Sequence, residues 1–361
     1  MPSSDVVDRE DFLRRLTWEL EQGHAILLAA PRRTGKSSIA LCALQGLRGS
    51  GHLTASVDLF ALTSVRDIAL ALADAIVVAA SGGWRAEAAR AGDRLRQALA
   101  IDRVRVALVG LEVDIFREPS RADPSELLDR ALGLAEALAE RAGTRFVLLL
   151  DEFQEAHRIG GDDLLRRLRA TMQAQRRTSY LFCGSQAGVM RALFGESRQA
   201  FYRFAYPLEL PPVPSEAWRH YIVAKMETLG RIVTDGAVDV MLDCTGGHPY
   251  DTMAVASRSL YFAERFGRRA VDADLAREAA AAAERELATF LEAELAAMPG
   301  RARDVLARIA LGAPLYAEVE APGSVARALR SLVADGLITR TGHGRYEIGE
   351  RMLASYLRAR G

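Results

Sequence analysis

Residues 26–38 read Ile-Leu-Leu-Ala-Ala-Pro-Arg-Arg-Thr-Gly-Lys-Ser-Ser, and this stretch decides the fold. It combines an apolar run long enough for a buried strand, a polar turn, and the start of a segment with helical spacing of apolar residues. A strand, a loop and a helix in this order gather backbone N–H groups and a helix N-terminus around one point, which makes a concave site for anions. The stretch therefore predicts an α/β unit whose first strand leads into an anion-binding loop.

The loop at residues 30–37 is close to the phosphate-binding pattern G-x-x-x-x-G-K-[ST]. Gly35 lets the backbone approach closely, Lys36 is expected to reach the terminal phosphates, and the Ser37 hydroxyl is expected to coordinate Mg²⁺. Ala30 stands where the pattern has Gly, which costs on the order of 1 kcal/mol only if this residue needs a positive φ. The alternative is a polar turn without a ligand, but Lys36 is one of only two lysines in a chain with 45 arginines. The predicted nucleotide-binding residues here are Pro31, Arg32, Arg33, Thr34, Gly35, Lys36, Ser37 and Ser38.

A second apolar run, Phe146–Leu150, ends in Asp151-Glu152. Continuous rather than alternating apolarity indicates a strand that is covered on both faces, as in a parallel sheet. Such a strand would deliver Asp151 to the outer coordination sphere of the Mg²⁺ ion and Glu152 to the position of the attacking water. The alternative is a pair of carboxylates that stabilise a helix N-terminus. The phosphate-binding loop favours the site, and a glutamate after the aspartate favours water activation over a simple kinase.

The next expected strand, Tyr180–Cys183, is followed by Gly184-Ser185-Gln186. A polar side chain at this place would hydrogen-bond the γ-phosphate or the water. Ser185 would serve equally well as the N-cap of the following helix.

The chain has 361 residues, which suggests two or three domains. Alternating strands and helices predict an α/β domain over residues 1–210. The Pro-rich stretch 211–214 then marks a boundary, and a helical lid domain is expected over 211–298. Pro299-Gly300 marks a second boundary, and residues 299–361 read as helices followed by a hairpin, which predicts a winged-helix domain.

Composition excludes several classes of protein. Lys+Arg and Asp+Glu both number 47, so a surface that binds nucleic acid over its whole extent is not expected. The three cysteines lie far apart, which excludes a disulfide scaffold or a zinc finger. No apolar run reaches the roughly 18 residues of a membrane span, and the first residues do not resemble a signal peptide. We expect a cytoplasmic protein of a reducing compartment, without a membrane partner.

The last 61 residues carry ten arginines and six acidic residues, a formal charge of +4. Arg327 and Arg330 are one turn apart on an expected helix, and Arg340 and Arg345 flank the expected hairpin. Such a helix can enter a major groove, so double-stranded DNA is one candidate partner. The alternative is a module that serves packing or a protein partner, because +4 is modest for DNA binding.

Four segments together resemble the archaeal-type P-loop ATPases of the STAND and AAA+ group. They are Arg-Arg-Thr-Gly-Lys-Ser, Leu-Leu-Leu-Asp-Glu-Phe-Gln, Gly-Ser-Gln after a strand, and Thr-Gly-Gly-His-Pro-Tyr at 245–250. Their order and spacing fit from Val7 to about residue 260, and a C-terminal winged helix also fits. Gln186 departs from the pattern, where a second serine is usual. The resemblance implies an ASCE/AAA+-like parallel sheet with helices on both faces, followed by a helical lid and a winged helix.

The resemblance also implies roles for further residues. Arg9 belongs to an opening segment that packs near the adenine, and Ser185 would be the sensor-1 residue. His248 and Pro249 would sit on the nucleotide from the lid. Arg203 falls where relatives carry an arginine finger that acts on a neighbouring subunit, and Arg198 competes for this role. An arginine acting in trans implies a homo-oligomer.

The sequence thus predicts an ATPase switch with ATP and Mg²⁺ as cofactors, in which Lys36, Glu152, Ser185 and Arg203 are catalytic. Nucleotide state would be coupled to rearrangement of the lid and winged helix, on DNA or in a nucleoprotein assembly. The alternative is a STAND-type signalling ATPase whose output is protein–protein assembly without DNA. A dinucleotide-binding protein is disfavoured because no G-x-G-x-x-G follows the first strand, and the lack of an Asn-Lys-x-Asp segment favours adenine over guanine.

Overall fold

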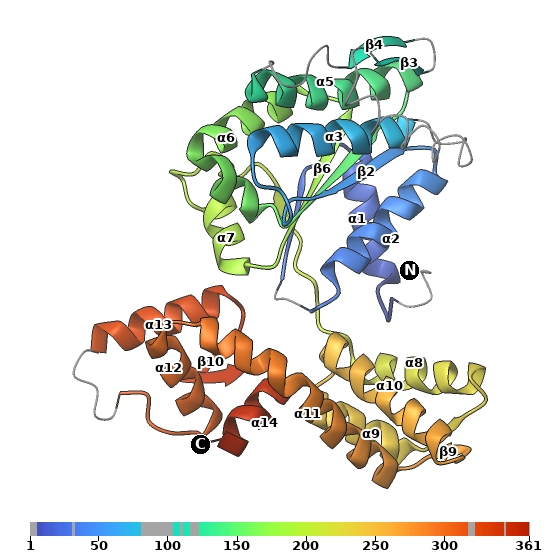
Figure 1. Ribbon diagram of the computed structural model, residues 1–361, viewed down its shortest axis with the longest axis vertical. Helices are drawn as coiled ribbons and strands as arrows, with labels where there is room; N and C mark the ends of the chain where they lie inside the picture. Colours follow the sequence, from blue (N-terminus) through green and yellow to red (C-terminus); the bar gives the residue numbers. More distant parts are fainter. Residues whose placement is uncertain are drawn as a thin grey trace.

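The computed structural model describes residues 6–30, 33–80, 104–108, 111–115, 123–316, 322–342 and 344–360. Two bodies, an α/β half and a helical half, are joined by the segment that follows β7 (Figure 1). The α/β half contains, in chain order, α1 (Glu10–Glu21), β1 (Ile26–Ala29), α2 (Lys36–Gly49), β2 (Leu53–Asp58), α3 (Val65–Ala80), β3 (Val104–Leu108), β4 (Leu111–Ile115), α5 (Pro124–Ala142), β5 (Phe146–Asp151), α6 (Gln154–Ala174), β6 (Thr178–Gly184), α7 (Ala187–Gly195) and β7 (Tyr206–Pro207).

Five strands form one sheet in the order β2-β5-β6-β1-β7, and every neighbouring pair is parallel. Because β6 lies between β1 and β5, the carboxyl ends of these three strands are adjacent. Ala29 is in register with Gly184, and Leu150 with Phe182. The sheet therefore brings together the phosphate-binding loop, the acidic pair and the Gly-Ser-Gln turn.

The inner strand β5 shows why the sheet is covered on both faces. Phe146, Leu148 and Leu150 point into a core with helices α3, α5, α6 and α7, whereas Val147 and Leu149 point into a core with α1 and α2. Successive side chains of a strand point to opposite faces, so a strand buried on both sides must be apolar throughout. The predicted parallel sheet with helices on both faces is confirmed.

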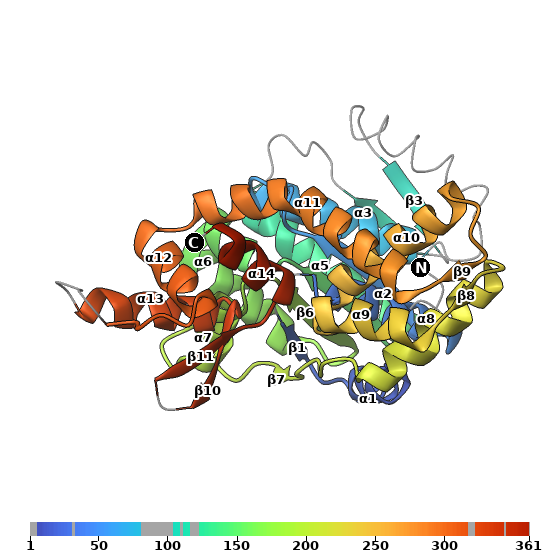
Figure 2. The same ribbon diagram turned by 90° about the horizontal axis from the view of Figure 1, so that it is seen from below.

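The helical half contains α8 (Ser215–Thr228), β8 (Ile232–Val233), α9 (Asp235–Thr245), α10 (Pro249–Arg265), β9 (Ala270–Val271), α11 (Ala273–Ala297), α12 (Gly300–Ala310), α13 (Pro322–Ala334), β10 (Ile338–Gly342), β11 (Arg345–Ile348) and α14 (Arg351–Arg360). Helix α11 extends from the lid (α8–α11) to the C-terminal module (α12–α14), as the view from below shows (Figure 2). One hydrophobic core runs from Trp218 to Leu357 through both parts. The division at residues 211 and 299 stays a prediction, and the two C-terminal parts share their core.

The C-terminal module also contacts the α/β half. The Arg191 side chain on α7 donates hydrogen bonds to the carbonyls of Val333 and Ala334, at the end of α13, at 3.2 and 3.1 Å. Gly188, also on α7, lies so close that a Cβ there would be 2.5 Å from the Ala334 Cβ. Gly188 thus lets α13 pack closely on α7, and Arg191 binds the carbonyls at the end of α13.

The spacing of apolar residues also predicts helices from about Val65 to Ala80 and from Pro124 to about Ala142, and the structure has both with these bounds. The apolar run Tyr206–Leu210 also predicts a strand, and the structure has a shorter one, Tyr206–Pro207, at the sheet edge beside β1. The Leu208 N–H still donates a hydrogen bond to the Leu27 carbonyl of β1, at 2.9 Å. The sequence also predicts a helical segment at 86–100, which lies outside the described residues. Helix α14 was not expected.

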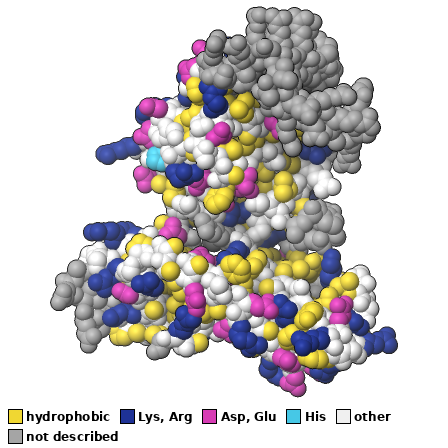
Figure 3. Space-filling model, in the orientation of Figure 1, with side chains coloured by type: hydrophobic (Ala, Val, Ile, Leu, Met, Phe, Trp, Pro, Cys, Tyr) yellow, Lys and Arg dark blue, Asp and Glu magenta, His cyan; other side chains and the backbone are white. Residues whose placement is uncertain are grey.

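On the face seen in Figure 3, basic and acidic side chains are interspersed over both halves, in keeping with equal numbers of the two. None of the helices in the described ranges combines the length and the apolar character that a bilayer span requires.

Candidate nucleotide-binding site

The loop between β1 and α2 has the local geometry that its sequence predicts. Gly35 has a φ of 90° and directly precedes α2, a conformation that a residue with a Cβ adopts only under strain. The Lys36 side chain is buried, and its Nζ donates a hydrogen bond of 2.7 Å to the Ala30 carbonyl across the loop. Ala30 does not adopt a positive φ, so alanine in place of glycine carries no backbone cost here.

Two side chains join the loop to the neighbouring strand. The Ser37 hydroxyl donates a hydrogen bond of 2.7 Å to Asp151 Oδ2, and Asp151 Oδ1 accepts one of 3.0 Å from the Glu152 N–H. A hydroxyl and a carboxylate oxygen are ligands that Mg²⁺ prefers. The pair therefore fits the predicted metal role of Ser37 and Asp151 in chemistry and in position.

Glu152 is the centre of a small hydrogen-bond network at the end of β5. Its Oε2 accepts from the Ser185 hydroxyl at 2.7 Å, from the Ser185 N–H at 3.2 Å, and from Gln154 Nε2. Partial burial raises the pKa of Glu152, but the hydrogen bonds from Gln154 and Ser185 and the charge of Lys36 outweigh it, so the pKa lies below its ordinary value. The carboxylate is therefore ionised at neutral pH.

These groups line a pocket of about 370 Å³, the loop pocket, which includes Lys36, Ser37, Phe60, Glu152, Gln154 and Ser185. Its wall is cationic at Lys36 and anionic at Glu152. A phosphate chain with its metal ion needs this combination of groups, because the lysine and the ion balance the phosphate charge while the glutamate can accept a proton.

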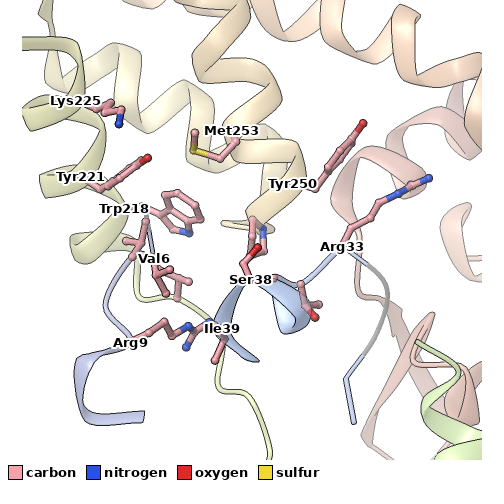
Figure 4. Close-up of a pocket in the computed structure, with 15 residues that line it drawn as sticks. Val6, Arg9, Arg33, Ser38, Ile39, Trp218, Tyr221, Lys225, Tyr250 and Met253 are labelled. Carbon is pink, nitrogen blue, oxygen red and sulfur yellow. The ribbon is translucent and has the colours of Figure 1, made fainter. Parts of the chain in front are cut away.

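A second pocket of about 440 Å³, the lid pocket, lies between the start of the chain and the lid (Figure 4). It is largely apolar and is lined by Val6, Arg9, Ile39, Trp218, Tyr221 and Met253, among others. Arg9 is buried, and burial lowers the pKa of its guanidinium although the charge of Asp8 opposes this. A flat aromatic ligand with polar edges suits such a lining.

Arg33 lines both pockets and extends from the loop to the helical half. Its Nη1 lies 3.7 Å from Glu294 Oε2 on α11 and 4.0 Å from Glu350 Oε2, just before α14. Its guanidinium also lies over the Tyr250 ring on α10, 5.3 Å from the centroid. One residue of the phosphate-binding loop thus contacts the lid and the C-terminal module.

The order of the strands and the comparisons with known proteins agree on the fold. A Walker-type ATPase of Pyrococcus abyssi superposes with a TM-score of 0.73 at 18% identity, covering 99% of this chain and 97% of that one. The chain has the AAA+ ATPase fold. The ORC2 protein of Aeropyrum pernix in ADPNP–ADP complexes gives a TM-score of 0.62 at 16% identity, over 98% and 94% of the two chains. The ORC1 protein of the same organism, in complex with DNA, gives 0.54 at 16%, over 99% and 95%. No family model and no curated protein matches the sequence.

Within this AAA+ fold, most residues predicted for the site come together. Arg33, Gly35, Lys36, Ser37 and Ser38 line the loop pocket with Glu152 and Ser185, and Arg9, Thr34 and Pro249 line the lid pocket. Pro31 and Arg32 lie outside the described residues.

His248 was expected on the nucleotide but is not among the residues that line either pocket. Its ring is buried, with Nδ1 3.2 Å from Asp251 Oδ2. The ring thus lies beside a buried carboxylate and not in the lining of either pocket. Pro249, the next residue, faces the pocket instead.

Arg203 and Arg198 are both exposed, in the segment between α7 and β7, and neither lines the loop pocket. An arginine that serves the site of another subunit has to be on the surface of its own. The exposure is therefore compatible with a role in trans for either residue.

Backbone strain marks the same segments. Apart from glycines, the described residues with a positive φ are Asp8, Arg33, Glu152 and Arg203. Each lies in a segment that the sequence assigns to the site. Residues in this region cost of order 1–3 kcal/mol and persist where the surroundings require them, which is common at functional sites.

Sequence reasoning missed residues from the lid and the C-terminal module, chiefly Trp218, Lys225, Glu294 and Glu350. A signal existed for Lys225, which is the second of the two lysines and lines the lid pocket. Gln154 belongs to the segment Asp-Glu-Phe-Gln, but its residue type alone indicates no role. Nothing in the sequence marks Glu294 and Glu350 among 47 acidic residues.

Proposed function

We propose that this protein is a Mg²⁺-dependent ATPase that acts as a switch, with the nucleotide bound between the α/β half and the lid. The loop pocket would hold the phosphates and the lid pocket the adenine. The two pockets are adjacent, because Arg33, Gly35 and Ser38 line both of them, and this supports one ligand that spans both. The bound nucleotides of ORC2, a structural neighbour, are in keeping with this proposal.

The residues divide the chemistry among them. Ser37 and Asp151 would hold the metal ion, which would neutralise charge on the phosphates. Lys36 would release the Ala30 carbonyl and bind the terminal phosphates. Glu152 would orient the attacking water and take its proton while the bond from the γ-phosphorus to the bridging oxygen breaks and ADP leaves.

The contacts of Arg33 carry the switch proposal. Each of its two ion pairs is partly exposed and contributes about 1 kcal/mol or less. A triphosphate in the loop pocket offers Arg33 a stronger anionic partner than Glu294 and Glu350. A ligand shifts a two-state equilibrium by its differential affinity, so phosphate binding would weaken the link to α11 and α14.

Hydrolysis would be completed by Arg203 of a neighbouring subunit in a homo-oligomer. Its exposure and its positive φ support a residue held in place for a partner rather than for its own core. An arginine that stabilises the charge of the transition state raises kcat about 10³–10⁵-fold.

The output of the switch would be on double-stranded DNA. Arg327, Arg330, Arg340 and Arg345 are all exposed on α13 and the β10–β11 hairpin, and the order of the elements is that of a winged helix. The DNA complex of ORC1, which shares the fold, is in keeping with this proposal.

The test is Mg-ATP turnover of the wild type and of Glu152→Gln, each with and without duplex DNA, across a salt series. We expect turnover to be lost in the variant, at least about 100-fold, and raised by DNA at low salt. Equal turnover in both proteins would overturn the catalytic assignment. Turnover that is lost in the variant but indifferent to DNA would favour the alternative of a signalling ATPase with a protein partner.

A further inference from the structure

Gln154 is the first residue of α6 and lies almost fully buried beside the loop pocket. Its Nε2 donates a hydrogen bond to Glu152 Oε2, the same oxygen that accepts from the hydroxyl and the N–H of Ser185. Three donors therefore converge on one oxygen of the carboxylate. Within the described part of the chain, no hydrogen-bond donor reaches the other oxygen, Oε1.

The opposite end of the Gln154 amide is buried without a partner. Its Oε1 has no hydrogen bond among the described residues. It packs against Gly184, where a Cβ would lie 2.5 Å from this oxygen, so the glycine leaves the space that the carbonyl fills. A buried carbonyl without a donor lowers stability, and an apolar side chain of the same shape would avoid this cost. Stability alone does not explain a glutamine at this place.

We propose that Gln154 is a positioning residue for Glu152, an inference that rests on the proposed ATPase function. By occupying Oε2 together with Ser185, the Gln154 amide fixes the rotation of the carboxylate. Oε1 is then the oxygen that accepts the hydrogen bond of the attacking water, and it takes the proton as the γ-phosphoryl group is transferred to that water. Without Gln154, the carboxylate can turn, and fewer encounters have the productive geometry.

The test compares Gln154→Met with the wild type in steady-state Mg-ATP hydrolysis and in thermal unfolding. Methionine keeps the length and fills the space, but it removes both the donor and the unpartnered carbonyl. We expect kcat to fall about tenfold or more and Tm to stay equal or rise. KM should stay within about twofold, because the residues proposed to bind the phosphates are unchanged. A purely structural role predicts the reverse, a lower Tm with kcat retained.

Two further variants sharpen the comparison. Gln154→His keeps a ring N–H within reach of Glu152 and is expected to recover part of the lost kcat. Gln173→Met makes the same chemical change on the exposed face of α6 and should leave kcat as in the wild type. The inference is overturned if Gln154→Met retains wild-type kcat, or if its kcat and Tm fall together and histidine recovers neither.

Failure of this inference is distinct from failure of the proposed function. If Glu152→Gln is inactive and Gln154→Met is fully active, the ATPase assignment stands and Gln154 has no positioning role. If Glu152→Gln is as active as the wild type, both fail, since there is no catalytic carboxylate for Gln154 to orient.

Discussion

Arg33 Nη1 lies 4.0 Å from Glu350 Oε2, although one residue belongs to the loop after the first strand and the other directly precedes the last helix. The contact also involves Glu294, 3.7 Å from the same nitrogen. Under the proposed function, the phosphates of a bound nucleotide and the acidic pair Glu294 and Glu350 would compete for one cation, Arg33. The consequences can be measured without knowing the partner of the protein.

The first prediction concerns pH. Burial raises the pKa of Glu350, as do Asp251 and Glu294, while His248 and Arg33 oppose the shift. A carboxyl whose folded pKa is raised stabilises the fold most below its unfolded value, about 4.3, and this contribution is lost as the pH rises through the folded pKa. Glutamine does not ionise, so the variant Glu350→Gln does not lose this stability as the pH rises. In urea unfolding, the stability of the variant relative to the wild type should therefore increase from pH 4 upward and level off above the raised pKa; a constant difference would contradict the shift.

The second prediction concerns the metal ion. Asp151→Asn keeps the size of the side chain and an acceptor for the Ser37 hydroxyl, but it removes the charge that a divalent cation needs. We expect Mg²⁺ to tighten ATP binding by the wild type at least about tenfold more than it tightens binding by the variant. Titration calorimetry with Mg²⁺ and with a chelator gives both ratios. Equal ratios for the two proteins would mean that Asp151 does not contribute to Mg²⁺ binding.

The third prediction concerns Arg203, the arginine that we propose to act in trans. Arg203→Ala should lower turnover about 10³-fold without loss of ATP binding, whereas Arg198→Ala should leave it within about twofold. In a mixture of Arg203→Ala and Glu152→Gln, a site on an Arg203→Ala subunit keeps Glu152 and receives Arg203 from a neighbouring Glu152→Gln subunit, so interfaces of this orientation are complete. Turnover should reappear in the mixture, and it should depend on protein concentration. A mixture as inactive as its components, in a protein shown to assemble, would rule out the shared site.

The fourth prediction concerns DNA. Arg327→Ala and Arg330→Ala remove exposed charges from α13. An arginine that binds a DNA phosphate releases a counterion, so removing it should reduce the slope of log K against log salt by about one. Arg301→Ala, on α12 of the same module, removes the same exposed charge elsewhere and serves as the matched control. Slopes that do not differ among the three variants would mean that α13 does not bind the duplex.

The sequence was sufficient for the α/β half because its signals are local. The apolar run Phe146–Leu150 predicts a strand covered on both faces, and the loop around Lys36 requires a strand before it and a helix after it. Neither signal predicts the order of the strands in the sheet. Asp151, Glu152 and Ser185 nevertheless lie near the loop, as expected, because parallel strands all end at the same edge of the sheet.

The contacts between the halves could not be predicted in the same way. Glu350 and Glu294 are ordinary glutamates in sequence, and they acquire a role only because α11 continues from the lid into the C-terminal module. His248 shows the opposite case. A resemblance implies a place on the nucleotide for it, which stays a prediction, whereas in the structure its ring lies 3.2 Å from the buried Asp251 carboxylate. Interactions that depend on how domains pack produce no periodic pattern in the sequence.

Gly188 lies where a larger side chain would separate the C-terminal module from the α/β half. It stands three residues after Ser185, and a single methyl group there would collide with Ala334 at the end of α13. Gly188→Val would therefore act as a wedge, holding the last module off the α/β half in the absence of any nucleotide. In such a variant, the effect of C-terminal module docking could be measured apart from the effect of ligand binding. Its turnover, compared with that of the wild type, would show how strongly the docked C-terminal module restrains the α/β half.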